Sequence, residues 1–256
     1  MLSRASLLLI ATVLLAGCTG PEATAAAPSP SPSAAAPSAA APSPTQLPPK
    51  EAVKAALRRL SASTYTYTVS GDYWTGQKYR ASGAHDPQAR KDSRTFTISG
   101  GDDAKTRKVI LIGDESYENR DGNSFWTHAY PVRLKPANPY RYADPKDPGG
   151  LARFTAAIHN ARRLTPGTYQ GEARLETKPS ELTYVPLGAP VFRFAKVSTW
   201  VKYTVNTDAK GDVSAITLIF GGDRGPIALT TTYSKIGQPV RISEPTSVRE
   251  LRRSLY

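Results

Sequence analysis

Three alternating segments near the C-terminus constrain the fold more than any other feature of this sequence. Residues 199–206, 213–220 and 227–233 place apolar side chains at every second position, and Gly- and Asp-containing turns separate them. A period of two with such turns is typical of an antiparallel β-meander. The middle segment is apolar on both faces, with one face carrying Val213, Ala215 and Ile219 and the other Ile216, Leu218 and Phe220. We therefore expect a central strand that is covered on both sides or faces an apolar cavity.

Further strands are predicted before this meander. Residues 64–74 place Tyr65, Tyr67 and Val69 on one face and threonine or serine on the other, which is typical of a half-buried strand. Shorter strands are predicted at residues 78–86, 93–99, 107–112, 115–118, 124–127 and 168–177. Residues 131–148 are rich in proline and tyrosine without a clear period, and we expect an irregular loop there.

Two helices are predicted beside these strands. Val53, Ala56, Leu57 and Leu60 have the three- and four-residue spacing of an amphipathic helix. A second helix is predicted over residues 148–164, with Asp147 as its N-cap and an apolar stripe of Leu151, Phe154, Ile158 and Ala161. The expected fold class is α+β, in which one large antiparallel sheet is covered by a few helices.

The N-terminal residues predict export and acylation. Arg4 precedes an apolar run of about eleven residues, which suits a signal peptide and is too short to span a bilayer. The run leads into Leu15-Ala16-Gly17-Cys18, which resembles the bacterial lipobox, in which the cysteine takes a diacylglyceryl group. Cys18 is the only cysteine of the chain. We therefore predict a signal peptide at residues 1–17 and a lipid anchor on Cys18 at the extracytoplasmic face of the cell membrane.

A linker and one domain are predicted after Cys18. Residues 19–48 consist almost wholly of Ala, Pro, Ser and Thr, which predicts a disordered tether. Residues 49–256 are enough for one domain with its own core. The net charge of +12 comes from scattered basic residues. For an exported protein it suggests anionic lipids or acidic wall polymers as partners and argues against nucleic acid, while solubility alone explains it equally well.

The sequence offers no constellation of catalytic residues. His85, His128 and His159 are far apart and lack metal-ligand spacing. No nucleophile elbow, zinc-protease motif or phosphate-binding loop is present. The carboxylate pairs Asp102-Asp103 and Asp114-Glu115 fall in predicted turns, where solvated side chains are common. We expect neither an enzyme nor a bound metal or cofactor.

Two stretches resemble a known family. Residues 117–126 run from a tyrosine through an Asp-Gly turn to a tryptophan, and residues 233–245 read Tyr-Ser-Lys-Ile-Gly-Gln-Pro-Val-Arg-Ile-Ser-Glu-Pro. They resemble the actinobacterial envelope lipoproteins of the LppX/LprA/LprF/LprG type, whose fold is similar to that of the lipoprotein carrier LolA. The resemblance implies a curved half-barrel sheet, closed by helices over an apolar cavity that holds acylated lipids or glycolipids. The proline-broken residues 182–197 depart from the smoother elements expected of this family.

Two functions follow as hypotheses. The first is a carrier whose cavity binds a lipid or lipidated molecule and is lined by Tyr65, Tyr67, Leu151, Phe154, Ile158, Trp200 and Leu218. For each of these residues taken singly, ordinary core packing is the commoner explanation. The second is an interaction or sensor module that docks another envelope protein through exposed aromatic side chains.

Overall fold

The computed structural model describes residues 47–72, 76–101, 104–135, 138, 140, 144–175, 200–221 and 225–255. The predicted signal peptide, Cys18 and nearly all of the predicted linker lie outside the described residues. So do Trp74, the Asp102-Asp103 pair and residues 182–197. The described residues belong to one compact unit, Thr45–Tyr256.

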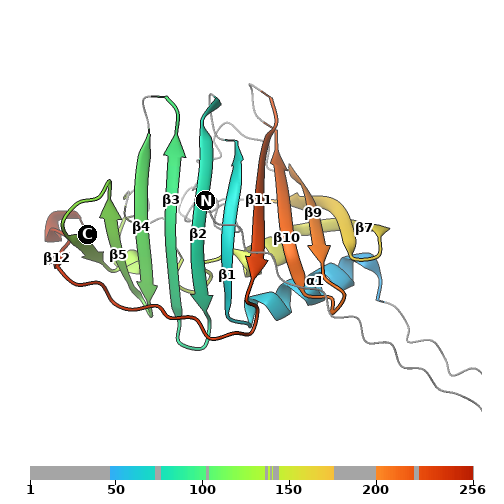
Figure 1. The fold of residues 1–256 in the computed structure, drawn as a ribbon, viewed down its shortest axis with the longest axis horizontal. Coiled ribbons are helices and arrows are strands. Elements are labelled where there is room, and N and C mark those ends of the chain that lie inside the picture. Colours follow the sequence, from blue (N-terminus) through green and yellow to red (C-terminus); the bar gives the residue numbers. More distant parts are fainter. Residues whose placement is uncertain are drawn as a thin grey trace, which may run out of the picture. The chain divides into compact units, whose positions relative to one another are not determined.

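The described residues form a twelve-stranded open sheet in the order β12-β6-β5-β4-β3-β2-β1-β11-β10-β9-β8-β7. All neighbours pair antiparallel except β12 and β6, which are parallel. Figure 1 shows the strands side by side. Their bounds are β1 Tyr65–Asp72, β2 Lys78–Asp86, β3 Lys91–Ser99, β4 Lys105–Ile112, β5 Glu115–Arg120, β6 Trp126–Ala129, β7 Ile158–Thr165, β8 Thr168–Arg174, β9 Trp200–Thr207, β10 Val213–Phe220, β11 Ile227–Ser234 and β12 Val248–Glu250.

Strand β1 joins two meanders. It pairs with β2 on one side and with β11 on the other, so that Tyr67 lies opposite both Gly83 and Tyr233. The predicted C-terminal meander is confirmed as β9, β10 and β11. Long-range pairing of β1 with β11 thus places the segment after the first helix at the middle of the sheet.

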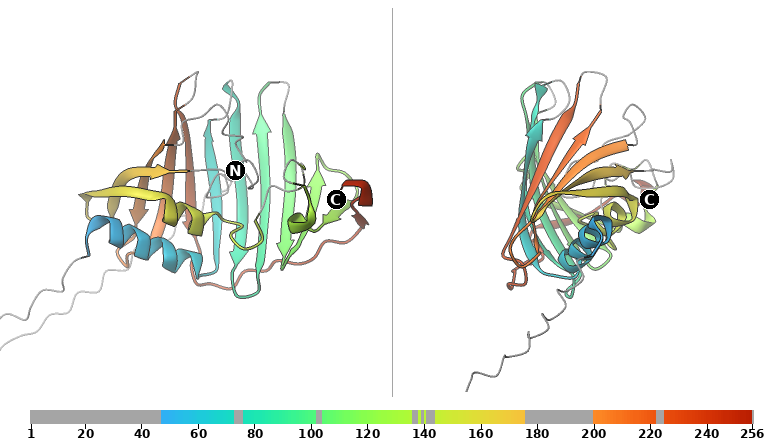
Figure 2. Two further views of the ribbon diagram at one scale, coloured as in Figure 1. Left: turned by 180° about the vertical axis from the view of Figure 1, so that it is seen from behind. Right: turned by 90° about the vertical axis from the view of Figure 1, so that its right-hand side faces the viewer.

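Two α-helices, α1 (Pro49–Ser61) and α2 (Leu151–Ala157), pack on one face of the sheet in the part of the chain that is described. Figure 2 shows the sheet curving around α1, and we call this face the concave face and the other the outer face. The buried side of α1 is made of Val53, Ala56, Leu57 and Leu60, as predicted. The expected fold, a curved antiparallel sheet with few helices, is confirmed at this level. No described helix combines the length and apolarity needed to cross a membrane.

The second predicted helix is wrong in its C-terminal half. Helix α2 ends at Ala157, and residues 158–165 form β7, which pairs with β8. The apolar spacing of Ile158 and Ala161 suits a helix, but a register shift between Ile158 and Asn160 turns both side chains toward the core from a strand. Arg162 and Arg163 therefore lie on the strand and donate to Gln170 and Tyr169 of β8. Sheet pairing outweighs local helical periodicity here.

The sequence predicted that β10 is either covered on both sides or faces an apolar cavity with its second side, and the first alternative is wrong. A bulge between Val213 and Ala215 places Val213 on the same side as Ile216, and both are buried. Leu218 and Phe220 complete this concave face, whereas Ile219 on the outer face is 37% exposed. Only one face of β10 therefore belongs to the core.

A C-terminal strap, which we define as residues 235–247, connects β11 to β12 across the outer face (Figure 1). Gly237 N donates to Thr64 O (2.9 Å), and Thr64 Oγ1 donates to Gln238 O (2.7 Å). Further along, Lys91 Nζ donates to Ile242 O at 3.2 Å, and Ile242 is buried. These bonds fix the strap to the ends of β1 and β3.

Candidate functional site

Six of the seven predicted ligand-binding residues come together on the concave face. Their exposed fractions lie between 0% and 4%, and all belong to one core cluster: Tyr65, Tyr67, Leu151, Phe154, Ile158 and Leu218. The rings of Phe154 and Tyr203 meet edge to face with centroids 5.4 Å apart. The described side chains between α2 and the sheet thus pack as a core, and the ligand-binding role of these residues stays a prediction.

Trp200 lies apart from the other six. It is 42% exposed at the start of β9, where its neighbour Val201 faces the core. Its ring contacts His159 edge to face at 5.1 Å, and the Arg174 guanidinium lies 5.9 Å from the ring centroid. Trp200 alternates with the buried Val201 and Tyr203, which leaves it on the outer face, away from the other six residues.

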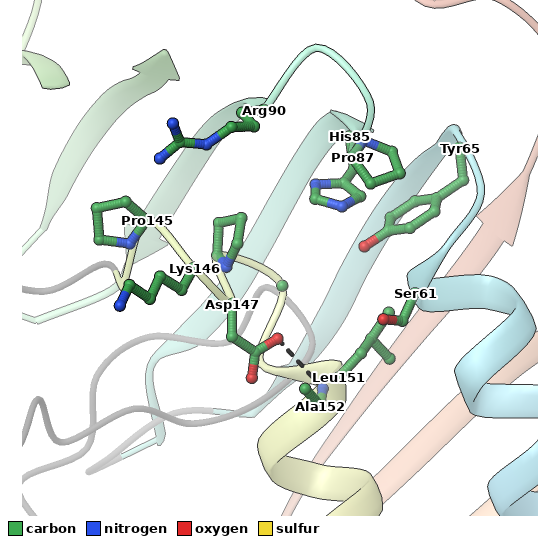
Figure 3. Close-up of a pocket in the computed structure, with 12 residues that line it drawn as sticks. Ser61, Tyr65, His85, Pro87, Arg90, Pro145, Lys146, Asp147, Leu151 and Ala152 are labelled. Carbon is green, nitrogen blue, oxygen red and sulfur yellow. Dashed lines mark hydrogen bonds between the residues drawn. The ribbon is translucent and has the colours of Figure 1, made fainter. Parts of the chain in front are cut away.

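A pocket of about 280 Å³ opens at the edge of this core. Tyr65 and Leu151 from the predicted set line it, together with His85 of β2 and Arg90 of the β2–β3 turn. Segment 145–149 supplies the facing wall. Figure 3 shows the rings of His85 and Tyr65 next to each other, with Arg90 and Lys146 on the other side of the pocket. Apolar core and charged side chains therefore meet in one place.

Two glycines and an aspartate position the pocket wall. Asp147 accepts hydrogen bonds from the backbone N–H groups of Ala152 (3.2 Å) and Arg153 (2.9 Å), as Figure 3 shows for Ala152. Asp147 was predicted as the N-cap, but α2 begins at Leu151 and its N-cap is Gly150 in a left-handed conformation (φ 66°). The Asp147 side chain still accepts from the first turn of the helix, from three residues further back than the N-cap. A Cβ on Gly149 would lie 2.8 Å from the hydroxyl oxygen of Tyr65. The chain therefore passes this close to Tyr65 only with glycine there.

Behind the pocket, buried polar groups connect β2 and β3 to segment 145–149. His85 Nδ1 lies 3.3 Å from Asp92 Oδ2 without the alignment of a hydrogen bond. Arg94 lies 3.6 Å from the other oxygen of Asp92 and donates to Pro148 O at 2.7 Å. Buried charges are tolerated when they are paired in this way. Arg94 thereby fixes the wall that carries Asp147.

Tyr67 completes this group. Arg94 Nε donates to its hydroxyl oxygen at 3.1 Å. Burial raises the pKa of Tyr67 above its ordinary value, and the nearby Arg94 charge only partly opposes this shift. Tyr67 therefore stays a neutral hydroxyl, and the charged side chains beside it are Asp92 and Arg94.

A second charged group lies further along the concave face. Glu118 of β5 is 4% exposed and contacts Arg107 at 3.3 Å and Arg120 at 2.8 Å. Arg120 also stacks on Tyr140 at 4.0 Å. This group was not predicted from the sequence, because its members come from two strands, β4 and β5, whose register is not visible locally. In this group the buried Glu118 carboxylate is paired with two arginines.

No cluster of three or more metal-ligating side chains occurs among the described residues. Asp114 pairs with Arg90 at 2.7 Å, whereas Glu115 accepts from the Tyr117 hydroxyl at 2.8 Å. The two carboxylates thus serve different partners. His85 and His128 are buried in different places, and His159 is exposed. The described residues bring none of the sequence-predicted polar groups together as a metal or acid–base site.

Comparisons with known proteins give distant structural likenesses. No protein-family model matches the sequence, and no curated protein matches it. The structure is similar to an uncharacterized conserved protein from Thermus thermophilus, with 12% identity, a TM-score of 0.42 and coverage of 79% of this chain and 98% of that chain. It is also similar to a LolA superfamily protein from Nitrosomonas europaea, with 9% identity, a TM-score of 0.29 and coverage of 77% and 96%. Likenesses this weak carry no argument about function, and the resemblance to the actinobacterial lipoproteins stays a prediction.

Proposed function

We propose that the protein is an extracytoplasmic lipoprotein, anchored through Cys18, that binds a lipid or lipidated molecule on the concave face of its sheet. The lipobox at residues 15–18 supports the anchor. The observation that carries the binding proposal is the pocket, where buried Tyr65 and Leu151 adjoin the charged side chains of Arg90, Lys146 and Asp147. An amphiphile needs such a boundary, with apolar surface for its chain and polar groups for its head.

The pocket size limits what it holds. Its volume of about 280 Å³ lies just below the roughly 300–1,000 Å³ typical of small-molecule sites. A pocket of this size accommodates a headgroup and the first methylenes of a chain. Burial of each methylene contributes about 0.8 kcal/mol in the pocket and nearly the same in a bilayer. The free energy of moving a chain between the membrane and the pocket is therefore close to zero, and the exchange is reversible.

Native mass spectrometry of the mature protein, purified from a membrane-containing host, tests this function. The expected result is a co-purifying lipid in the wild type that is lost in Ala152→Phe, because Ala152 lines the pocket and is exposed, so that a ring fills the space without disturbing the core. Ala156→Phe is the matched control, an exposed alanine one helical turn further along α2 that does not line the pocket. Repeated absence of lipid from the wild type, or equal loading of both variants, would overturn the proposal.

A second candidate function, docking of another envelope protein, draws on Trp200. This exposed aromatic ring, with Arg174 beside it, has the composition of an interface anchor. Quenching of tryptophan fluorescence discriminates the two functions. Strong quenching of all three tryptophans (Trp74, Trp126 and Trp200), with no protection by added lipid, favours docking over lipid binding.

A further inference from the structure

The outer face of the sheet carries a groove that the proposed lipid site does not use. It has a volume of about 510 Å³ and crosses β1 to β4. Most of the side chains on its floor end in hydroxyl groups: Thr66, Thr68, Ser82, Ser93, Thr95 and Ser234. Lys108, Lys235 and Trp126 complete the polar and aromatic lining, and Ile110 is the aliphatic side chain that faces the groove with them.

Strand pairing arranges these groups in straight rows. Thr68 lies opposite Ser82, Ser82 opposite Thr95, and Thr95 opposite Lys108. Neighbouring strands are about 4.8 Å apart, so that this row presents a polar group at that interval along a line perpendicular to the strands. Ser234 and Thr66 form part of a second row, in which their hydroxyl oxygens lie 2.8 Å apart. A regular row of donors and acceptors suits an extended polyol with repeating units.

The charge of the groove is positive. Neither Lys108 nor Lys235 forms an ion pair within the described part of the chain, and no carboxylate belongs to the groove lining. The chain as a whole has a net charge of +12. A ligand of this groove is therefore expected to be an anion, drawn by local and by overall charge.

Trp126 gives the groove an aromatic end. Two backbone-directed hydrogen bonds position it: Trp126 N donates to Ser247 O of the strap at 2.9 Å, and Asn119 Nδ2 donates to Phe125 O at 2.9 Å. The electron-rich face of an indole attracts the partly positive C–H groups of a sugar ring.

We propose that this groove binds an anionic polysaccharide, with hydroxyl rows and Trp126 contacting the sugar units and Lys108 and Lys235 contacting the acidic groups. The site lies on the face opposite the lipid pocket and does not depend on it. For a protein tethered outside the cell, such a contact would hold the domain against an acidic envelope polymer.

Binding of polygalacturonate to the mature protein in detergent micelles, measured by biolayer interferometry, tests the proposal. Fully methyl-esterified polygalacturonate is the matched neutral probe. The acidic polymer is expected to bind at about 50 mM salt and to weaken as salt rises, since exposed charges are screened. The esterified polymer and the double variant Lys108→Ala/Lys235→Ala are each expected to bind roughly tenfold more weakly.

The control distinguishes binding in this groove from attraction to the overall net charge of the protein. Lys50→Ala/Lys210→Ala removes the same charge outside the groove, on α1 and on the β9–β10 turn. Equal weakening in both double variants, or equal binding of both polymers, would sink the proposal. Binding to vesicles of anionic phospholipid that disappears in Lys108→Ala/Lys235→Ala would identify a membrane surface as the ligand instead and would also overturn it.

Discussion

Replacement of Phe154 by alanine tests whether α2 encloses a packed core or an open cavity. Phe154 is 0% exposed, lies in the main core cluster and meets the Tyr203 ring edge to face. A side chain that lines a hollow loses few contacts when it is shortened. A packed one leaves a void whose lining loses its dispersion contacts outright.

The expected cost follows from this packing. Phe-to-Ala changes in close-packed cores cost about 3–5 kcal/mol, and the aromatic pair with Tyr203 places Phe154→Ala in the upper half of that range. For a domain of this size each kcal/mol lowers the Tm by about 2–4 °C. We therefore expect a decrease in Tm of roughly 8–20 °C.

Thermal unfolding followed by circular dichroism measures the effect. Leu164→Ala is the control, because Leu164 is 47% exposed and should cost no more than about 0.5 kcal/mol. A loss below about 1 kcal/mol for Phe154→Ala would refute the packed interior. It would favour a cavity that lipid or solvent already fills, in which case added lipid should stabilise the wild type but not the variant.

Three further changes test other parts of the molecule. Burial raises the pKa of Tyr203 to about 12, so the neutral Tyr203 hydroxyl contributes its full stability below the unfolded-state pKa near 10, and this contribution is lost as pH rises from there to about 12. The Tm measured at increasing alkaline pH should therefore decline less steeply in Tyr203→Phe than in the wild type. Equal slopes would refute this. Glu118→Gln leaves Arg107 and Arg120 without their shared carboxylate and should cost about 3 kcal/mol in urea unfolding, whereas Asp72→Asn, which breaks an exposed pair with Lys78, should cost under about 1 kcal/mol. Cys18→Ser should abolish incorporation of labelled palmitate and move the protein to the soluble fraction, and continued labelling would disprove acylation at this cysteine.

Local patterns predicted the elements whose exposed and buried sides differ most. The alternation of residues 64–74 and the helical spacing from Val53 to Leu60 both correspond to observed elements, because each pattern reflects one buried face. Strand β12 was not predicted, since all three of its residues are exposed and carry no apolar pattern. Its position is set by pairing with β6, where Val248 lies opposite Trp126. No local sequence pattern of either segment indicates that pairing.

The candidate site was predictable only in its apolar part. The spacing of Leu151 and Phe154 on a helix and the alternation of Tyr65 correctly placed these residues on the concave face. The polar part was not predicted, because its residues lie on different strands and come together only through the register in which those strands pair. Asp92 meets His85 only because β2 and β3 pair with these two residues directly opposite each other. Trp200 differs in this respect, because its alternation with Val201 and Tyr203 is a local pattern that already places it on the face opposite the core.

The register of β1 couples the two proposed binding faces. Tyr65 and Tyr67 reach the concave face only if Thr66 and Thr68 reach the outer one, and a slip by one residue would exchange both sets. Gly83 opposes such a slip, because a Cβ there would lie 2.4 Å from the Tyr67 ring, so the ring fits only over this glycine. The strap adds a second constraint, since its hydrogen bonds to Thr64 hold the residue just before β1. A sheet fixed at these two points keeps the tyrosine side chains of β1 toward the proposed lipid pocket and its hydroxyl side chains toward the groove. The same strand would therefore contact both proposed ligands, one on each face.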